Sequence, residues 1–246
     1  MTAQRTSITS GYSVDQGLGC GDGTTAVPAA QRGANVLGVD IARNLVEAGN
    51  LRAKEQNLDN LRFQHGDACA LDDVSNDSFE LVVSVFGAMF APRPSDAARE
   101  MVRVTRPGGR IVMGNWIPGD PTLVAQLLRI SSAYSPPPPE GFVSPMTWGI
   151  AENVVERFVN AGIAAKSVTC EPDTFVFEAP VTPTEYLTWF RDYYGPTMNA
   201  FDAAEQSGRA DELFGELDEL FNAQNSSTDP ARTAIPATFL RVTVAV

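Results

Sequence analysis

The sequence has little positive charge, few cysteines and a single histidine. Its 18 lysines and arginines stand against 30 aspartates and glutamates, which gives a formal net charge of -12 at pH 7. Because nucleic-acid binding draws on a basic surface, this balance argues against nucleic acid as a substrate or partner. The three cysteines, Cys20, Cys69 and Cys170, are far apart and not at the spacing of metal ligands. We therefore expect reduced thiols in a cytoplasmic protein, with no disulfide and no metal site.

The sequence also lacks long apolar runs. Nowhere do about 18 consecutive apolar residues occur, and the first residues, MTAQRTS, lack the apolar core of a signal peptide. We therefore expect no membrane span. A chain of 246 residues with 43% hydrophobic content can bury one substantial core. We predict a single domain over 1–246, with helical insertions at about 120–147 and 182–230 and a short, atypical segment before Gly19.

The chain is organised around the stretch Gly19-Cys20-Gly21-Asp22-Gly23. Three alternating glycines allow a sharp turn from a strand into a helix, let a ligand lie against bare backbone, and expose amide hydrogens at the helix start. The apolar run Val36–Asp40 then ends on a carboxylate, where a nucleotide-binding α/β fold would meet ribose hydroxyls. These residues predict a site for a small polar ligand.

Short apolar runs alternate with helix-compatible stretches from Gly19 onward, which is the pattern of a parallel sheet with helices on both faces. The residues Pro107-Gly108-Gly109 predict a turn that no regular element crosses, and the final alternation predicts an antiparallel strand at the sheet edge. We expect strands at 14–18, 36–40, 61–65, 79–85, 110–115, 166–178 and 237–246, and helices at 24–32, 42–56, 95–104, 121–134, 148–161, 184–194 and 196–225.

Several segments of the first half together resemble one known family. In chain order they are the glycine turn, the strand ending at Asp40, the segment Gly66-Asp67-Ala68, the strand Phe79–Val85 and the segment Arg106–Met113. This order resembles the class I S-adenosylmethionine-dependent methyltransferases, particularly the small-molecule enzymes of the ubiquinone/menaquinone methyltransferase type. The resemblance runs from about Gly19 to Trp116. It implies a Rossmann-like sheet of seven mostly parallel strands with an antiparallel last strand, a helical lid, and S-adenosylmethionine as cofactor.

The resemblance also implies roles for individual residues. The three glycines would carry the methionine part of the cofactor, Asp40 would accept hydrogen bonds from the ribose hydroxyls, and Asp67 would accept one from the adenine amino group. Ile41 would pack on the adenine face, and Ala68 and Val85 would contribute backbone contacts. The cofactor-binding residues expected from the resemblance are Gly19, Gly21, Gly23, Asp40, Ile41, Asp67, Ala68 and Val85.

A small-molecule methyl acceptor is the expected partner, bound by a monomer or a homodimer. Aromatic residues of the second half are candidates for an apolar pocket that takes an aromatic or prenyl-like acceptor. The expected acceptor-binding residues are Met89, Trp116, Tyr134, Trp148 and Tyr193. Direct methyl transfer gains mainly from alignment and exclusion of water, so it requires no catalytic triad. No spacing singles out a catalytic base, and the single histidine, His65, is interpreted as structural.

The segment before Gly19 departs from the family. The first strand would be Val14–Leu18, with Gly17 where the family has an acid and polar residues where the core should be. An altered or lost start, a shifted register in which Asp15 serves, and an impaired site all fit this departure. A cofactor-binding pseudoenzyme or scaffold is therefore the alternative function.

A nicotinamide-dependent oxidoreductase is a third hypothesis, because such enzymes share the α/β frame. The dinucleotide fingerprint requires a third glycine that the chain lacks: counted from Gly19 its position holds Thr24, and counted from Gly17 it holds Asp22. The residues therefore do not fit dinucleotide binding.

Overall fold

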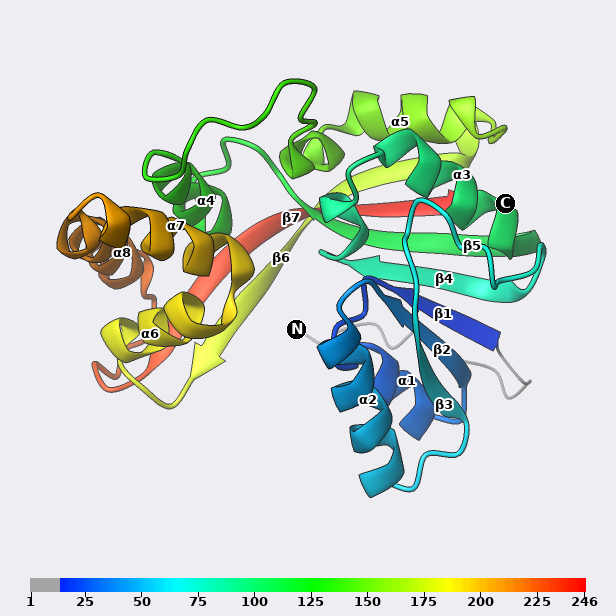
Figure 1. Ribbon diagram of the computed structural model, residues 1–246, viewed down its shortest axis with the longest axis horizontal. Coiled ribbons are helices and arrows are strands. Elements are labelled where there is room, and N and C mark those ends of the chain that lie inside the picture. The colour runs from blue at the N-terminus through cyan, green and yellow to red at the C-terminus, as the bar shows by residue number, and fades with distance from the viewer. Residues whose placement is uncertain (1–13) are drawn as a thin grey trace. The chain divides into compact units, whose positions relative to one another are not determined.

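The computed structural model describes residues 14–246, with the side chain of Val14 left aside (Figure 1). Seven strands form one sheet in the order β3-β2-β1-β4-β5-β7-β6, mostly parallel with an antiparallel β5-β7-β6 portion. This confirms the predicted fold class. The strands are β1 Val14–Leu18, β2 Asn35–Asp40, β3 Leu61–His65, β4 Phe79–Val85, β5 Thr105–Trp116, β6 Val168–Ala179 and β7 Thr233–Ala245.

Helices connect most of the strands. The α-helices are α1 Ala26–Gln31, α2 Arg43–Glu55, α3 Pro94–Val104, α4 Leu123–Ser132, α5 Ala151–Asn160, α6 Pro183–Tyr193, α7 Gly195–Gln206 and α8 Ala210–Gln224. Short 3₁₀ turns occur at η1 Ala88–Phe90, η2 Pro145–Gly149 and η3 Ala165–Ser167. Most of the helices expected in the first half therefore form within a few residues of their predicted bounds.

The chain divides into two compact units. Among the described residues, the first comprises those up to Met113 together with Arg157–Val168 and Thr243–Val246, and the second comprises Gly114–Glu156 and Thr169–Val242. The single-domain organisation stays a prediction.

The first unit is built on parallel strands whose faces are buried by helices. Central β1 pairs with β2 on one side and with β4 on the other, and β2 pairs with β3. Apolar side chains of α1 and α2 pack with those of β2 and β3 into one cluster around Phe63. The Asn50 side chain of α2 both donates to the carbonyl and accepts from the amide of Phe63, each at 2.9 Å. This contact holds α2 in register with β3.

The second unit has a helical core. Leu123 and Leu127 of α4, Leu187 of α6, and Leu213 and Phe221 of α8 are fully buried. The first turn of α6 is closed by a capping box, in which Thr182 and Glu185 satisfy each other's backbone amides. Apolar residues on one face of each helix thus bind these helices together.

Three sequence-based expectations about elements are wrong. The turn at 107–109 lies inside β5, because the amide of Gly108, at φ 79°, donates to the carbonyl of Val246 over 2.8 Å. The helix expected over 196–225 is two helices, because the chain turns at Gly208 with φ 71°. The last strand, β7, lies between β5 and β6, so β6 occupies the edge.

Within residues 14–246, none of the helices has both the length and the apolar character that crossing a membrane requires. In the same part of the chain, no group of three or more His, Cys, Asp and Glu side chains is arranged to hold a metal ion. Cys20, Cys69 and Cys170 are free thiols.

Candidate functional site

The carboxyl ends of β1 and β4 mark the point where the strand order of the first unit reverses. From β1 the chain continues to β2 and β3 on one side, and it then returns to place β4 on the other side of β1. In open α/β sheets, ligands bind in the crevice outside the carboxyl ends at such a switch point. The segments expected to bind cofactor follow β1, β2, β3 and β4, so they belong to this edge.

The glycine turn follows β1 in a conformation that favours glycine. Gly19, Gly21 and Gly23 have φ values of 62°, 56° and 107°. A Cβ on Gly19 would lie 2.7 Å from the Cα of Gly87, whereas a Cβ on Gly21 would meet nothing within 4 Å. The turn therefore packs tightly against the loop after β4 at Gly19 and leaves open space at Gly21.

Asp40 ends β2 and is joined to the glycine turn. Its Oδ2 accepts a hydrogen bond of 2.8 Å from the amide of Gly21, and its Oδ1 accepts one of 2.9 Å from the amide of Ala42. Each carboxylate oxygen has a second lone pair, so Asp40 can still accept from a ligand hydroxyl. The next side chain, Ile41, is 66% exposed and offers an apolar surface beside the carboxylate.

Asp67 follows β3, the strand that pairs with β2. Asp40 pairs with His65 in the strand register, and its carbonyl accepts from the amide of Gly66 over 3.0 Å. Oδ1 of Asp67 accepts from the amide of Cys69, and Oδ2 lies 3.3 Å from the guanidinium of Arg93. Ala68 beside it is half-buried. Two carboxylates from adjacent strands thus lie at the same edge as the glycine turn.

A serine that the sequence analysis did not select ties β4 to the turn. Ser84 is buried, and its hydroxyl donates to the carbonyl of Leu18 and accepts from the amide of Ala88, both at 2.8 Å. Between these contacts, Phe86 has φ 59°, a left-handed conformation that is costly for a side chain of this size. Such strain persists only where surrounding contacts enforce it. No sequence pattern marks Ser84, because the carbonyl that its hydroxyl donates to belongs to Leu18, 66 residues earlier in the chain.

The position where the family has an acid before the first glycine is occupied by Gly17. The strand β1 nevertheless forms over Val14–Leu18 as expected, with Asp15 and Gln16 buried. A Cβ at Gly17 would lie 3.2 Å from the Cβ of Cys20. Burial is the main cause that raises the pKa of the Cys20 thiol to about 12, so this sulfur stays protonated at neutral pH.

The residues at this edge fit an adenosyl cofactor with a methionine tail. Two carboxylates can accept from hydroxyl and amino groups, an exposed isoleucine can cover a flat ring, and the space at Gly21 leaves backbone open to a ligand. Val85, the last residue of β4, is also exposed there. Whether each of these residues binds cofactor stays a prediction.

The residues expected to bind the acceptor are mostly inside the protein. Met89 is buried in the first unit, and Trp116, Tyr134 and Trp148 are buried in the second. The hydroxyl of Tyr134 donates to Oε1 of Glu216 over 2.7 Å, and the guanidinium of Arg209 lies 4.2 Å from the centre of its ring. Tyr193, in contrast, is 83% exposed. Their part in acceptor binding stays a prediction.

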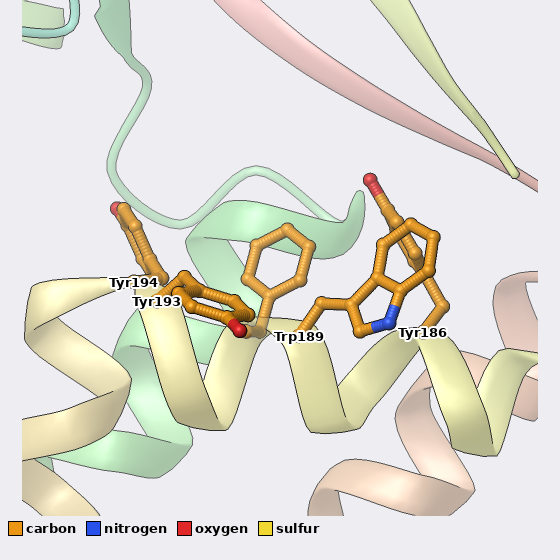
Figure 2. Close-up of a pocket in the computed structure, with 5 residues that line it drawn as sticks. Tyr186, Trp189, Tyr193 and Tyr194 are labelled. Atoms are coloured by element: carbon orange, nitrogen blue, oxygen red, sulfur yellow. The ribbon is translucent and has the colours of Figure 1, made fainter. Parts of the chain in front are cut away.

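The second unit contains a pocket of about 570 Å³ on α6. Figure 2 shows Tyr186, Trp189, Tyr193 and Tyr194 rising from the same side of this helix. Phe190 completes the lining. Of these five residues, only Tyr193 is in the list of expected acceptor-binding residues. The aromatic spacing of i, i+3, i+4, i+7 and i+8 is the sequence signal that marks the whole set.

Comparisons with known proteins agree with this geometry. Residues 17–113 match the family described as "Methyltransferase domain". An uncharacterized protein of Mycobacterium tuberculosis is 31% identical over 205 residues, which span 82% of this chain and 72% of that protein. A demethylmenaquinone methyltransferase of Clavibacter sepedonicus is 35% identical over 96 residues, which span 39% of this chain and 38% of that enzyme.

Solved structures share the fold. The YcgJ protein of Bacillus subtilis superposes with a TM-score of 0.60 at 20% identity, over 95% of this chain and 92% of that one. A phosphoethanolamine N-methyltransferase of Haemonchus contortus, in complex with phosphomonomethylethanolamine and S-adenosylhomocysteine, gives a TM-score of 0.55 at 19% identity, over 95% of this chain and 48% of that one.

Proposed function

Because the chain belongs to the class I S-adenosylmethionine-dependent methyltransferases, we propose that it transfers a methyl group directly to a small apolar or aromatic molecule. One observation carries the cofactor half of this proposal. The amide of Gly21 contacts the carboxylate of Asp40, and Asp67 follows the adjacent strand, so the glycine turn and both acids belong to one strand edge. We propose that this edge binds the adenosyl and methionine parts of S-adenosylmethionine.

Direct methyl transfer requires the protein mainly to position the cofactor and the acceptor. S-adenosylmethionine supplies a methyl group on a positively charged sulfur. The chain's part is to bind and orient this cofactor, to align an acceptor atom with it, and to exclude water. Asp40 and Asp67 would fix the adenosine, and the turn held by Ser84 would keep the backbone at Gly19–Gly23 in a constant place.

The lining of the pocket on α6 and the name of one relative support the proposed class of acceptor. The pocket on α6 is lined by five aromatic side chains, which favour a flat apolar molecule. The relative from Clavibacter sepedonicus is named for action on demethylmenaquinone. The net charge of -12 argues against a nucleic-acid acceptor. We propose a cytoplasmic monomer or homodimer, in keeping with three free thiols.

Calorimetry with S-adenosylhomocysteine tests the cofactor site directly. The full chain is expected to bind it, and Asp40→Ala is expected to weaken binding at least tenfold, because both the ribose acceptor and the anchor of the turn are lost. Asp73→Ala, at an exposed acid elsewhere in the first unit, is the matched control and should leave binding unchanged. Unchanged binding in Asp40→Ala, or no binding by the parent chain, would contradict the proposal.

A further inference from the structure

The segment that carries Asp67 has no regular structure of its own. Between the end of β3 at His65 and the start of β4 at Phe79 the chain forms no helix and no strand, and Asp67 makes only an isolated bridge with Ala70 (Figure 1). The place of Asp67 therefore depends on contacts with other elements. Contacts of this kind come from α3, which belongs to the same compact unit.

The second half of α3 holds the far part of this segment. Oε2 of Glu100 accepts a hydrogen bond of 2.6 Å from the amide of Leu71. The guanidinium of Arg103 donates to the carbonyls of Leu71 and Val74 at 2.9 and 2.8 Å, and it is also paired with Glu100. These bonds fix the segment from Leu71 onward without involving Asp67. The segment can therefore keep its place when contacts at the Asp67 end are changed.

Arg93, the residue before α3, contacts the side chain of Asp67. Its Nη2 lies 3.3 Å from Oδ2 of Asp67, and its Nε donates to Oδ2 of Asp96 over 2.8 Å. The hydrogen bond with Asp96 is the main cause that raises the pKa of Arg93. Because the guanidinium is planar and its Nε is bound to Asp96, its remaining N–H groups have a set direction. One of them is directed at Asp67.

The backbone of Arg93 is also tied to this part of the chain. Pro94 disfavours the helical conformation for the residue before it, and Arg93 lies outside the helical region at φ -121° and ψ 80°. The carbonyl of Arg93 accepts from the thiol of Cys69 over 3.5 Å, and the amide of Cys69 donates to Oδ1 of Asp67 over 2.8 Å. The side chain of Arg93 thus contacts one oxygen of Asp67, and its backbone is linked through Cys69 to the other.

Both carboxylate oxygens of Asp67 already accept hydrogen bonds. Each oxygen keeps a second lone pair, so what Asp67 can offer a ligand is a further acceptor. An amino group on a purine ring can donate to it, whereas a carbonyl at the same ring position would place its lone pairs against those of the carboxylate. A site built in this way would distinguish an amino-bearing purine from its deaminated form.

We propose that Arg93 is a positioning residue, which makes the cofactor site selective for an amino-bearing purine by holding Asp67 as a fixed acceptor. This role rests on the proposed S-adenosylmethionine site and deepens it. Arg93 would act through Asp67 and need not touch the cofactor. Arg99 offers a contrast within α3, because its guanidinium also pairs with Asp96 and its side chain is 57% exposed against 54% for Arg93. Among the described residues, Arg99 forms no ion pair with Asp67.

Calorimetry on the full chain tests this role with two probes. S-adenosylhomocysteine carries the ring amino group, and S-inosylhomocysteine is the same molecule with a carbonyl in its place. The parent chain is expected to bind the first about tenfold more tightly, because the second leaves Asp67 without a donor. Arg93→Ala is expected to lower this ratio about threefold, since a carboxylate that can turn away weakens adenosyl binding alone. Arg99→Ala is the matched control and should keep the parental ratio. Circular dichroism checks that each variant is folded.

Salt concentration gives a second measurement that needs no variant. The side chain of Arg93 is half exposed, so its attraction to Asp67 is screened as ionic strength rises. The binding ratio of the parent chain is therefore expected to fall between about 0.05 M and about 0.5 M salt, whereas that of Arg93→Ala should stay nearly constant. If Arg93→Ala does not fold, the salt dependence of the parent chain decides.

A ratio that falls in Arg93→Ala, is kept in Arg99→Ala and falls with salt in the parent chain supports the positioning role. Equal weakening of both probes in Arg93→Ala overturns it, because a purely structural role would give that result. A parental ratio in Arg93→Ala, an equal loss in Arg99→Ala, or a parent ratio that does not change with salt also overturns it. The two proposals fail distinguishably. A parent chain that binds no S-adenosylhomocysteine refutes the cofactor site, whereas one that binds both probes equally well refutes the role of Arg93 alone.

Discussion

The backbone amide of Gly21 donates a hydrogen bond of 2.8 Å to Oδ2 of Asp40, and so joins the turn after β1 to the end of β2. One carboxylate therefore does two things: it holds the glycine turn in place, and it keeps lone pairs available for a ligand. A substitution at Asp40 acts on both, so variants of the turn itself are needed to separate folding from cofactor binding.

Gly19→Ala and Gly21→Ala are expected to separate these two effects. Both residues have positive φ, which costs an alanine about 1–2 kcal/mol. Gly19→Ala would in addition press a methyl group against the backbone of Gly87 at 2.7 Å, so it should lose more stability. Gly21→Ala has open space and should stay folded, but its methyl group would occupy the place proposed for the cofactor.

Urea unfolding and S-adenosylhomocysteine calorimetry on both variants check this prediction. Gly19→Ala is expected to lose more free energy of unfolding than Gly21→Ala. Folded Gly21→Ala is expected to bind S-adenosylhomocysteine with a Kd at least fivefold higher than that of the parent chain. A folded Gly21→Ala with parental affinity would contradict the place assigned to the cofactor.

Ser84→Ala is expected to weaken cofactor binding by three- to tenfold while the protein stays folded. The change removes the donor to Leu18 and leaves the buried amide of Ala88 without its partner, at a cost of about 1–3 kcal/mol. Thr105→Val is the control, because the buried hydroxyl of Thr105, the first residue of β5, donates to the carbonyl of Met101 over 2.7 Å and takes no part in the contacts at the carboxyl ends of β1 and β4. Both variants should lose stability, but Ser84→Ala alone should raise the Kd for S-adenosylhomocysteine. Equal Kd values would mean that Ser84 serves only stability.

Stability is expected to fall between about pH 10 and pH 12, in part through Tyr186. Burial raises the pKa of this phenol from 10.0 to about 12, so over this range the unfolded chain has released a proton that the folded chain keeps. The native state is then disfavoured as pH rises, by up to about 2 kcal/mol at its upper end. The contribution is fully present below pH 10.

Urea unfolding of the parent chain and of Tyr186→Phe at pH 9.5 and 11.5 measures this effect. Other titrating groups are common to both proteins, so the difference between their pH slopes reports Tyr186. A parent chain whose slope equals that of Tyr186→Phe would rule the effect out.

Tyr134→Phe is expected to lower the free energy of unfolding by about 1 kcal/mol. The change removes the hydrogen bond of 2.7 Å from Tyr134 to Glu216, which ties the segment after α4 to α8, but keeps the ring next to Arg209. Urea unfolding measures the loss, and Glu216→Gln, which can still accept the bond, should lose less. A Glu216→Gln variant that loses more free energy of unfolding than Tyr134→Phe would contradict this prediction.

Local pattern was enough to place most elements. The expected bounds of β1, β3 and β4 agree with the structure at every residue, because alternating apolar runs and the turns between them depend on neighbours in the chain. Pattern was insufficient where pairing with distant residues overrides a local turn signal, as at Gly108, whose amide is bonded to Val246.

The sequence by itself determined that a glycine turn and two carboxylates follow successive strands. Since parallel strands end at a common edge of the sheet, it also determined that these groups belong to the same edge. Only the tertiary structure decided what surrounds that edge: β7 between β5 and β6, and Ser84 bonded to a carbonyl 66 residues earlier. It also decided which aromatic rings of α6 are covered and which stay open. Such contacts join residues far apart in the chain, so they follow from strand pairing and helix packing, which local composition does not specify.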